Sequence, residues 1–173
     1  IYPGETLGVV GESGCGKSTL GRTILRLQEP TDGQILYDGK DITKYNRRQM
    51  KQMRQNMQLI FQDPYASLDP RKSVVEIIAE YMIINRTYPS KKEIYNYAAH
   101  LMDIVGLARR YANAYPHELD GGRRQRIGIA RALSLHPKFI VCDEPVSALD
   151  VSIQAQILNL LMDLQDEMNL TYM

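Results

Sequence analysis

The spacing of apolar residues near the start of the chain predicts a strand and a helix separated by a glycine-rich loop. Residues 6–10 form a short run of β-prone side chains, and the helical spacing of Leu20, Ile24 and Leu27 predicts a helix over residues 18–27. A strand that leads into such a loop, with a helix directly after it, is typical of α/β proteins.

The same alternation returns in the second half of the chain. Residues 57–61 and 139–142 have the continuous apolar character of buried strands, and helical spacing predicts a helix after Gly122 and another over residues 151–168. Turn sequences on both sides of residues 34–37 predict a small antiparallel element there. The chain starts without Met and stops in an apolar stretch that resembles the beginning of a strand, so we interpret it as a fragment of a longer protein.

The middle of the chain has a different character. Ser73 with Glu76, and Ser90 with Glu93, each match a capping box, in which a hydroxyl and a carboxylate satisfy free backbone amides at a helix start. We therefore expect residues 73 to about 112 to be mostly helical, with a stop at Gly106.

These elements predict one domain over residues 1–173 with an α/β core that is interrupted by a helical subdomain. Residues 1–63 and 121–173 form the core in this prediction, and residues 64–120 form the helical subdomain.

Residues 11–18, with the sequence G-E-S-G-C-G-K-S, fit the phosphate-binding pattern G-x-x-x-x-G-K-[ST] between a predicted strand and a predicted helix. Glycines let backbone N–H groups turn toward the phosphates, and the helix N-terminus adds positive potential. Lys17 would then reach the β- and γ-phosphates, and Ser18 would ligate Mg²⁺. A merely flexible turn does not account for the strand-to-helix context. The candidate nucleotide-binding residues are Gly11, Glu12, Ser13, Gly14, Cys15, Gly16, Lys17, Ser18 and Thr19.

Two carboxylates follow the apolar strand at residues 139–142. A parallel strand would deliver Asp143 and Glu144 to the carboxyl edge of the sheet. We expect Asp143 to hold Mg²⁺ through a water molecule, and Glu144 to orient or deprotonate the attacking water. An Asp-Glu pair taken alone more often belongs to a solvated turn, and only the phosphate loop upstream favours a hydrolytic site.

Further motifs, in this order along the chain, resemble those of the ABC ATPase family. Residues 61–64 (F-Q-D-P) resemble the family's Q-loop, and residues 119–126 (L-D-G-G-R-R-Q-R) resemble its signature, which the family writes L-S-G-G-Q. Residues 147–150 (S-A-L-D) resemble its D-loop. Residues 61–71 and 142–156 closely resemble the ATPase subunits of bacterial oligopeptide and dipeptide importers, with nickel importers of the same branch as near neighbours.

The resemblance implies a P-loop NTPase (RecA-like) core with an ABC-specific helical insertion and a small antiparallel β element. It implies that Gln62 contributes to the Mg²⁺ site with Ser18 and Asp143, and to hydrolysis with Glu144 and Lys17. The resemblance also implies roles for two further groups of residues. The signature residues that would bind the ATP of a second subunit are Leu119, Asp120, Gly121, Gly122 and Arg123, and the D-loop residues are Ser147, Ala148, Leu149 and Asp150.

The resemblance also implies partners and cofactors. ATP and Mg²⁺ would be held between two ATPase subunits arranged head to tail, and the pair would drive integral membrane permease subunits and, indirectly, a solute-binding protein. Such a subunit is cytoplasmic and lies on the inner face of the cell membrane. The family's adenine-stacking aromatic residue would precede Ile1 and its switch histidine would follow Met173. The transported solute, and the choice between a homodimer and a heterodimer, stay open at this stage.

Position 120 departs from the family pattern, because Asp stands where the family has Ser. An ionised carboxylate cannot donate a hydrogen bond to a γ-phosphate. Two like charges about 4 Å apart repel by about 4 kcal/mol at an effective dielectric constant of about 20. One hypothesis is therefore a weakened, slower ATP site, to which Arg123 supplies a compensating cation. The alternative is that Asp120 only caps the following helix.

Composition narrows the alternatives. Lys and Arg total 21 against 20 Asp and Glu, so the net charge of +1 gives no field that would attract nucleic acid. A soluble ABC protein that acts on nucleic acid or the ribosome is the second hypothesis, and a degenerate regulatory half-site is the third. The two cysteines form no disulfide framework and fit a reducing compartment.

Other polar features have plainer interpretations. The basic residues Arg47, Arg48, Lys51 and Arg54 are interpreted as a solvated helix face, with an acidic partner as the alternative. The three histidines are scattered and are interpreted as structural or solvated rather than as metal ligands.

Overall fold

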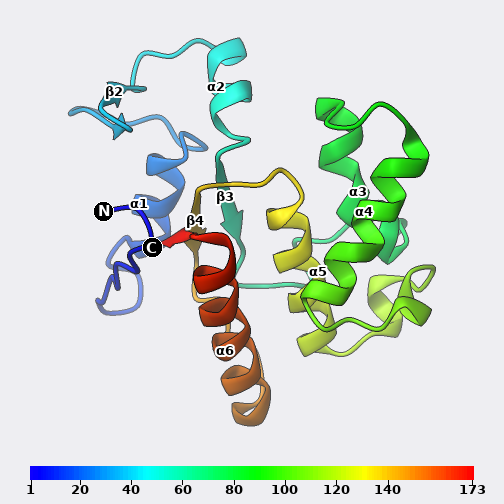
Figure 1. Cartoon of the computed structure of the whole chain (residues 1–173). Helices are drawn as coiled ribbons and strands as arrows, with labels where there is room; N and C mark the ends of the chain where they lie inside the picture. Colours follow the sequence, from blue (N-terminus) through cyan, green and yellow to red (C-terminus); the bar gives the residue numbers. More distant parts are fainter.

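The computed structural model describes residues 1–173, and a three-stranded parallel sheet lies at its centre (Figure 1). The strands lie in the order β3 (Met57–Ile60), β4 (Phe139–Cys142) and β5 (Thr171–Tyr172). A separate antiparallel hairpin consists of β1 (Leu36–Tyr37) and β2 (Lys40–Asp41). The predicted buried strands are therefore present, and they are paired in parallel, as the α/β prediction requires.

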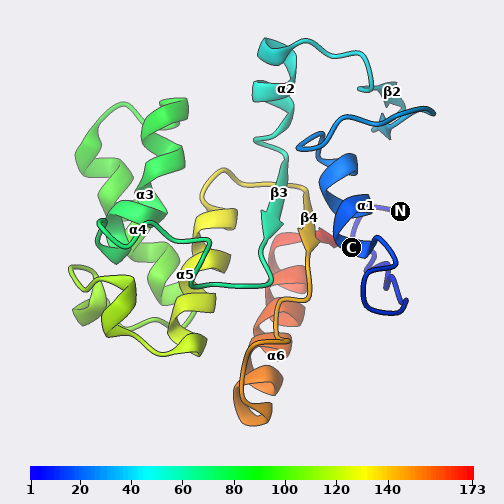
Figure 2. The ribbon, with the colours of Figure 1, turned by 180° about the vertical axis from the view of Figure 1, so that it is seen from behind.

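Helices surround the sheet. They are α1 (Lys17–Ile24), α2 (Arg47–Met53), α3 (Val74–Asn85), α4 (Lys91–Ile104), α5 (Gly121–Leu133) and α6 (Val151–Met168), with two short 3₁₀ turns, η1 (Arg109–Tyr111) and η2 (Pro116–Glu118). Seen from behind, α3 and α4 lie on one side of the molecule and α1 and the hairpin lie on the other, with the sheet and α6 between them and α2 above β3 (Figure 2). None of the helices combines the length and the apolarity that a membrane crossing requires.

The helical part is attached to the sheet through a shared core. One cluster of 25 buried residues includes Ile77 and Met82 of α3, Leu101 of α4, Ile127 of α5 and Ile140 of β4. These apolar side chains follow helical spacing on α3, α4 and α5, so each helix turns one face into the same interior. A smaller cluster around Leu25, Ile42 and Met50 anchors α1, α2 and the hairpin to the other face of the sheet.

The predicted helix caps are present in different degrees. The Glu76 carboxylate accepts from both the backbone N–H and the hydroxyl of Ser73 at 2.8 Å. At α4, the Ser90 hydroxyl accepts from the Glu93 amide at 3.2 Å, but no return bond from the Glu93 side chain is present. Gly106, with φ of 67°, ends α4 as predicted.

The predicted strand at residues 6–10 is wrong over most of its length. Only Thr6 pairs with Tyr172, as an isolated parallel bridge. Tyr172 donates to the Glu5 carbonyl at 2.9 Å, and Leu7 donates to the Tyr172 carbonyl at 3.0 Å. Beyond this bridge the segment makes no strand pairing, and Val10 is 97% exposed. The helix predicted to reach residue 27 ends at Ile24, and Arg26 follows with φ of 51°.

Candidate functional site

The glycine-rich loop folds around the amino group of Lys17. Lys17 Nζ donates to the carbonyl of Gly11 at 2.8 Å and to the carbonyl of Glu12 at 3.0 Å. Gly14 and Gly16 have φ values of 78° and 101°, which side-chain-bearing residues rarely adopt. The loop is therefore a closed turn that ends directly at the first residue of α1.

The other candidate nucleotide-binding residues of this segment are open to solvent. Glu12, Ser13, Cys15 and Thr19 are exposed. A Cβ atom added at Gly11 would lie 2.5 Å from the Cys15 sulfur, so Gly11 leaves room for that side chain. The loop backbone and Lys17 thus form a cradle whose outer surface is open to solvent.

The start of α1 lies against the end of β4. The Ser18 hydroxyl donates to Asp143 Oδ1 at 2.7 Å, and the Asp143 side chain is only 8% exposed. Gly21 makes this approach possible, because a Cβ atom there would lie 2.7 Å from Val141 Cγ1. Arg22, one position further along α1, places its guanidinium 4.0 Å from Asp143 Oδ2.

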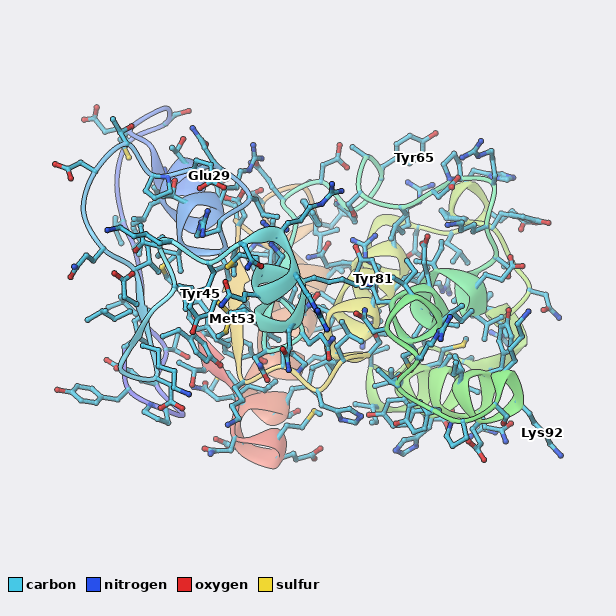
Figure 3. The ribbon with its side chains drawn as sticks, turned by 90° about the horizontal axis from the view of Figure 1, so that it is seen from above. Glu29, Tyr45, Met53, Tyr65, Tyr81 and Lys92 are labelled. Atoms are coloured by element: carbon cyan, nitrogen blue, oxygen red, sulfur yellow. The ribbon has the colours of Figure 1, made fainter.

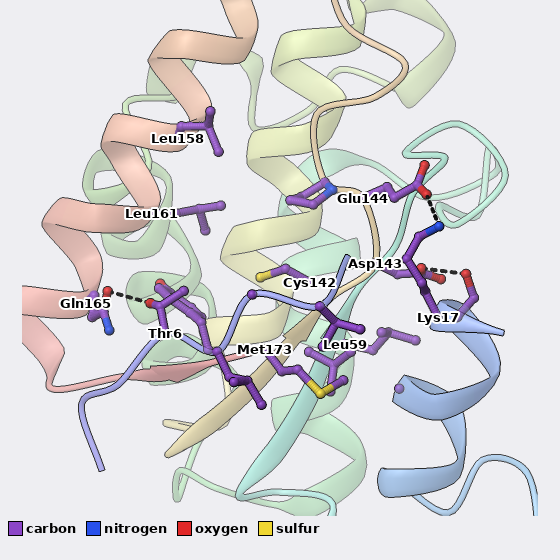
Figure 4. Close-up of a pocket in the computed structure, with 18 of the residues that line it drawn as sticks. Thr6, Lys17, Leu59, Cys142, Asp143, Glu144, Leu158, Leu161, Gln165 and Met173 are labelled. Carbon is purple, nitrogen blue, oxygen red and sulfur yellow. Dashed lines mark hydrogen bonds and ion pairs between the residues drawn. The ribbon is translucent and has the colours of Figure 1, made fainter. Parts of the chain in front are cut away.

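Glu144 lies between the loop and the Q-loop segment. Its carboxylate is 3.8 Å from Lys17 Nζ and accepts from Gln62 Nε2 at 2.8 Å. Figure 4 shows Lys17 and Glu144 pointing toward each other at the mouth of a cavity, with Asp143 beside them. Glu144 has φ of 47°, a left-handed conformation that is costly for a residue of this type. Backbone strain of this kind clusters at functional sites, which supports a role for the aligned carboxylate.

Ser147 joins the same network. Its hydroxyl donates to the Glu144 carbonyl at 3.2 Å and lies 3.4 Å from Gln62 Nε2. No protein group donates to Gln62 Oε1, so this oxygen is available to a ligand. The structure therefore brings together Lys17, Ser18, Gln62, Asp143 and Glu144, which come from three separate stretches of the chain.

A cavity of about 410 Å³ extends from this cluster into the protein. Lys17, Ser18, Asp143 and Glu144 line its polar end, whereas its other walls are mainly apolar. Figure 4 shows Leu158 and Leu161 of α6 at this apolar end, away from the charged side chains. The charged groups therefore form a compact site at one end of the cavity.

The signature and D-loop residues do not line this cavity, although Ser147 contacts Gln62 and Glu144 beside it. Asp120 is the N-cap of α5, and its Oδ1 accepts from the Arg123 amide at 2.8 Å. Leu119 is buried, and Gly121 packs so closely on Leu149 that a Cβ atom would lie 3.0 Å from Leu149 Cδ2. Asp150 is the N-cap of α6, and Ala148 is exposed. A nucleotide held at the phosphate loop would thus not touch the signature of the same subunit.

A second cleft, of about 740 Å³, separates α2 from α3 and α5. Figure 3 shows Tyr81 of α3 on the side of the helical part that faces α2. The cleft has apolar lining residues and a basic rim. The basic residues are Arg47, Arg48, Lys51, Arg54 and Arg131. The stretch that sequence analysis interpreted as a solvated helix face therefore forms one wall of a cleft.

The histidines make aromatic contacts rather than a metal site. His136 lies 3.3 Å from the hydroxyls of both Tyr88 and Tyr97, and His117 stacks on Tyr115. Burial raises the pKa of Tyr97 to about 12. The chain contains no cluster of three or more His, Cys, Asp or Glu residues that could hold a metal ion. A divalent ion at Ser18 and Asp143 would therefore depend on other oxygen atoms for the rest of its ligands.

Sequence reasoning missed Gly21, Arg22 and the contacts of Arg131. The sequence held a signal for Gly21. A glycine in the second turn of a predicted helix indicates that another segment packs closely against that helix, and here the segment is β4. The other two contacts depend on which elements become neighbours in space, and no local pattern encodes that.

Residues 1–147 match the protein family described as ABC transporter. The oligopeptide transport ATP-binding protein OppF of Bacillus subtilis is 56% identical over 100% of this chain and 57% of its own length. OppF of Haemophilus influenzae is 56% identical over 99% of this chain and 52% of its own length. The chain thus spans about half the length of the curated relatives that it matches.

Solved structures resemble the chain closely. The dimeric, post-hydrolysis structure of the ATP-binding cassette MJ0796 with ADP and Pi matches with a TM-score of 0.88 at 32% identity, over 99% of this chain and 74% of that chain. The cbiO1 structure from Clostridium perfringens, part of the ABC transporter complex cbiONQ, matches with a TM-score of 0.87 at 29% identity, over 99% of this chain and 66% of that chain. The predicted α/β P-loop fold is confirmed.

Proposed function

Because this chain belongs to the ABC transporter family, we propose that it is a subunit that binds and hydrolyses ATP to power a bacterial importer of oligopeptides or dipeptides. The observation that carries the proposal is the Lys17–Glu144 and Ser18–Asp143 arrangement at one end of a single cavity. A cation, a hydroxyl and two carboxylates at this spacing suit a bound triphosphate, its metal ion and an attacking water.

The loop would hold the phosphates. Lys17 now donates to two loop carbonyls, and its amino group is the group that a β- or γ-phosphate would attract away from them. The backbone N–H groups of the loop and the first turn of α1 add positive potential. We assign Gly11, Glu12, Ser13, Gly14, Cys15, Gly16 and Thr19 to this cradle with Lys17 and Ser18.

The oxygen groups beside the loop fit Mg²⁺. Ser18 Oγ and Asp143 Oδ1 are 2.7 Å apart, and Gln62 presents an oxygen with no protein donor. Mg²⁺ prefers such oxygen ligands and keeps several water molecules. We propose that Ser18 and Gln62 ligate it directly and that Asp143 does so through water. When bound, the ion neutralises phosphate charge during transfer.

Glu144 would orient the attacking water and accept its proton. Gln62 Nε2 donates to one carboxylate oxygen and Lys17 Nζ lies 3.8 Å from the other, so the side chain has two partners before any nucleotide enters. Preorganisation of this kind contributes to catalysis because phosphoryl transfer depends on positioning and charge rather than on covalent chemistry.

A second ATPase subunit would complete each site. The signature residues Asp120–Arg123 lie outside the cavity, so they would act on the nucleotide of a partner, with the D-loop residues 147–150 at the same interface. The related cassette MJ0796 is described as dimeric. We propose a head-to-tail pair of subunits.

The cleft beside α2 is the surface that best fits a permease subunit. It combines an apolar lining with the basic rim described above, and it adjoins Phe61, the neighbour of Gln62. A membrane protein docked there would sense movement of the Q-loop segment. We propose that the subunit lies in the cytoplasm at the inner face of the membrane, and that a solute-binding protein acts on the other side. The identity of 56% to an oligopeptide transport protein supports the peptide class of solute.

Two measurements test the proposal. Equilibrium binding of ATP with Mg²⁺ should weaken strongly in Lys17→Ala, since the main phosphate cation is lost, while the unrelated variant Lys138→Ala should bind normally. Proteins that co-purify with the native assembly should be integral membrane permeases and an ATPase partner. Co-purification with RNA or DNA instead would favour the soluble nucleic-acid alternative, against which the net charge of +1 already argues.

A further inference from the structure

Asp120, the residue that departs from the family signature, is bound twice by Arg123. The Arg123 backbone N–H donates to Asp120 Oδ1 at 2.8 Å, and the Arg123 guanidinium donates to Oδ2 at 2.6 Å. The two residues are three positions apart at the start of α5, so one residue satisfies both oxygens of the carboxylate. Such a charge-assisted contact orients both partners.

A third residue, Tyr111, also contacts the guanidinium. Arg123 Cζ lies 4.9 Å from the centre of the Tyr111 ring, within the range of a cation–π contact. Tyr111 belongs to η1, a different part of the helical region from α5. The guanidinium thus contacts both a carboxylate and an aromatic face, and its side chain is 42% exposed.

Close packing fixes this pair relative to the segment that follows Glu144. A Cβ atom at Gly122 would lie 2.7 Å from Ile153 Cγ2, and one at Gly121 would lie 3.0 Å from Leu149 Cδ2. The start of α5 therefore cannot move away from the start of α6 without losing these contacts. Asp120 and Arg123 share that fixed position.

We propose that Arg123 contacts the terminal phosphate of the partner subunit's ATP, and that Asp120 is the positioning residue that aims it. The inference rests on the proposed function, because it needs the second subunit. A guanidinium has five N–H donors, and the contact with Asp120 leaves the others free to bind phosphate oxygens. The carboxylate is neutralised by the same group, so it does not repel the nucleotide as an unpaired aspartate would.

A set of variants separates this role from simple helix capping. Asp120→Asn keeps a good N-cap but removes the charge that orients Arg123. Arg123→Gln restores the family's residue at that position but leaves the carboxylate unpaired. The double variant Asp120→Ser with Arg123→Gln removes both charges. Arg110→Gln is the matched control, because Arg110 also lies over the Tyr111 ring, at 5.1 Å, but does not contact Asp120.

The measurement is ATP-dependent association of the ATPase subunits in the native assembly, at several salt concentrations. We expect Arg123→Gln to weaken association by roughly tenfold, since it loses charge-assisted bonds and exposes a carboxylate. The double variant should recover most of that loss, and Arg110→Gln should match the parent protein. Asp120→Asn should keep its melting temperature while association becomes weaker. Arg123→Lys keeps the charge but loses the planar guanidinium with its several N–H donors. Its association should be weaker than that of the parent protein and stronger than that of Arg123→Gln. This variant serves as the test if Arg123→Gln does not fold.

The outcomes are distinct. The role of Arg123 would be overturned if Arg123→Gln associated as tightly as the parent protein. If only Arg123→Lys folds, equal association of that variant and the parent protein would overturn it. A double variant weaker than Arg123→Gln would overturn it as well. Absence of any nucleotide-dependent association or hydrolysis in the parent protein would instead count against the proposed function itself.

Discussion

The side-chain amide of Gln62 donates to the carboxylate of Glu144 at 2.8 Å, although 82 positions separate the two residues in the chain. Gln62 follows β3 and Glu144 follows β4, and these strands are paired in parallel from Met57 with Phe139 to Ile60 with Cys142. Parallel pairing therefore brings both side chains to the same edge of the sheet. The position of the proposed base depends on the register of two strands.

Glu144→Gln is expected to lower hydrolysis by roughly 10²-fold or more, because an amide cannot accept the proton of the attacking water. Nucleotide binding should persist, since the loop and Lys17 are untouched. Single-turnover hydrolysis and equilibrium binding of ATP measure the two effects separately. Glu167→Gln, a change at an exposed position far along α6, is the control and should behave like the parent protein. Undiminished hydrolysis in Glu144→Gln would show that the base is another group.

Gly21→Ala is expected to separate α1 from β4. The new methyl group would lie 2.7 Å from Val141 Cγ1, so the protein should lose about 1–3 kcal/mol of stability, as overpacked cores do. Binding of Mg²⁺ with ATP should weaken too, because Ser18 moves away from Asp143. Denaturant unfolding and nucleotide titration measure both effects.

Gly128→Ala is the matched control for that change. Gly128 also lies inside a helix, α5, but a Cβ atom there would meet no neighbour within 4 Å. Alanine should therefore stabilise the protein by roughly 0.5–1 kcal/mol, through its better helix propensity. If both substitutions have the same effect, the close approach of α1 to β4 is not what positions Ser18.

The two thiols should differ sharply in reactivity. Cys15 is exposed in the phosphate loop, whereas burial raises the pKa of Cys142 to about 12. At pH 8 an alkylating reagent should modify Cys15 first, since the thiolate is the reactive form. Mass spectrometry of the modified peptides identifies the site. Protection of Cys15 by ATP with Mg²⁺ is expected, and equal labelling with and without nucleotide would argue against phosphates at this loop.

Cys142 also links stability to alkaline pH. Its pKa is raised in the folded state, so the folded protein favours the neutral thiol more than the unfolded chain does. The contribution of the neutral thiol to the free energy of unfolding is present in full below the ordinary thiol pKa. It is lost as the pH rises toward 12. Cys142→Ala should therefore flatten the fall in melting temperature over that range. An equally steep fall in this variant would assign the effect to Tyr97 or Tyr172, whose pKa values are also raised by burial.

Arg131→Lys is expected to destabilise the protein more than Arg131→Met. Arg131 is 8% exposed, and its guanidinium donates to the Ser67 carbonyl at 2.6 Å while lying over the rings of Phe61 and Tyr81. No carboxylate pairs with it, and desolvation lowers its pKa. An ammonium group is more strongly hydrated and stacks less well, whereas Met fills the same space without charge. Urea unfolding of the two variants decides the order, and a more stable Lys variant would contradict it.

Local patterns predicted much of the fold. The bounds of α6 and β4 follow from apolar runs flanked by clear start and stop residues, and Asp120 caps α5 as its chemistry allows. The strand predicted at residues 6–10 was wrong because a strand depends on its partner, and Tyr172 pairs with only one residue there. β-prone side chains alone did not reveal that limit.

Part of the candidate site could likewise be predicted from local sequence, and part could not. The phosphate loop and the Asp143–Glu144 pair are contiguous stretches, so their residue types and spacing suggest their chemistry directly. The contact of Arg123 with Tyr111 and the cleft beside α2 join segments that are distant in sequence, or that come from different helices. Such relationships follow from the packing of the shared core and need the structure.

The length of α5 has a mechanical consequence. Asp120 and Arg123 lie at its beginning, Arg131 lies in its last turn, and a helix of 13 residues is about 20 Å long. A rod of this kind is stiff along its axis, so a displacement imposed at the nucleotide interface would reach the wall of the α2 cleft almost undiminished. If the proposed function holds, α5 would carry movement from the nucleotide of the partner subunit to the proposed permease contact.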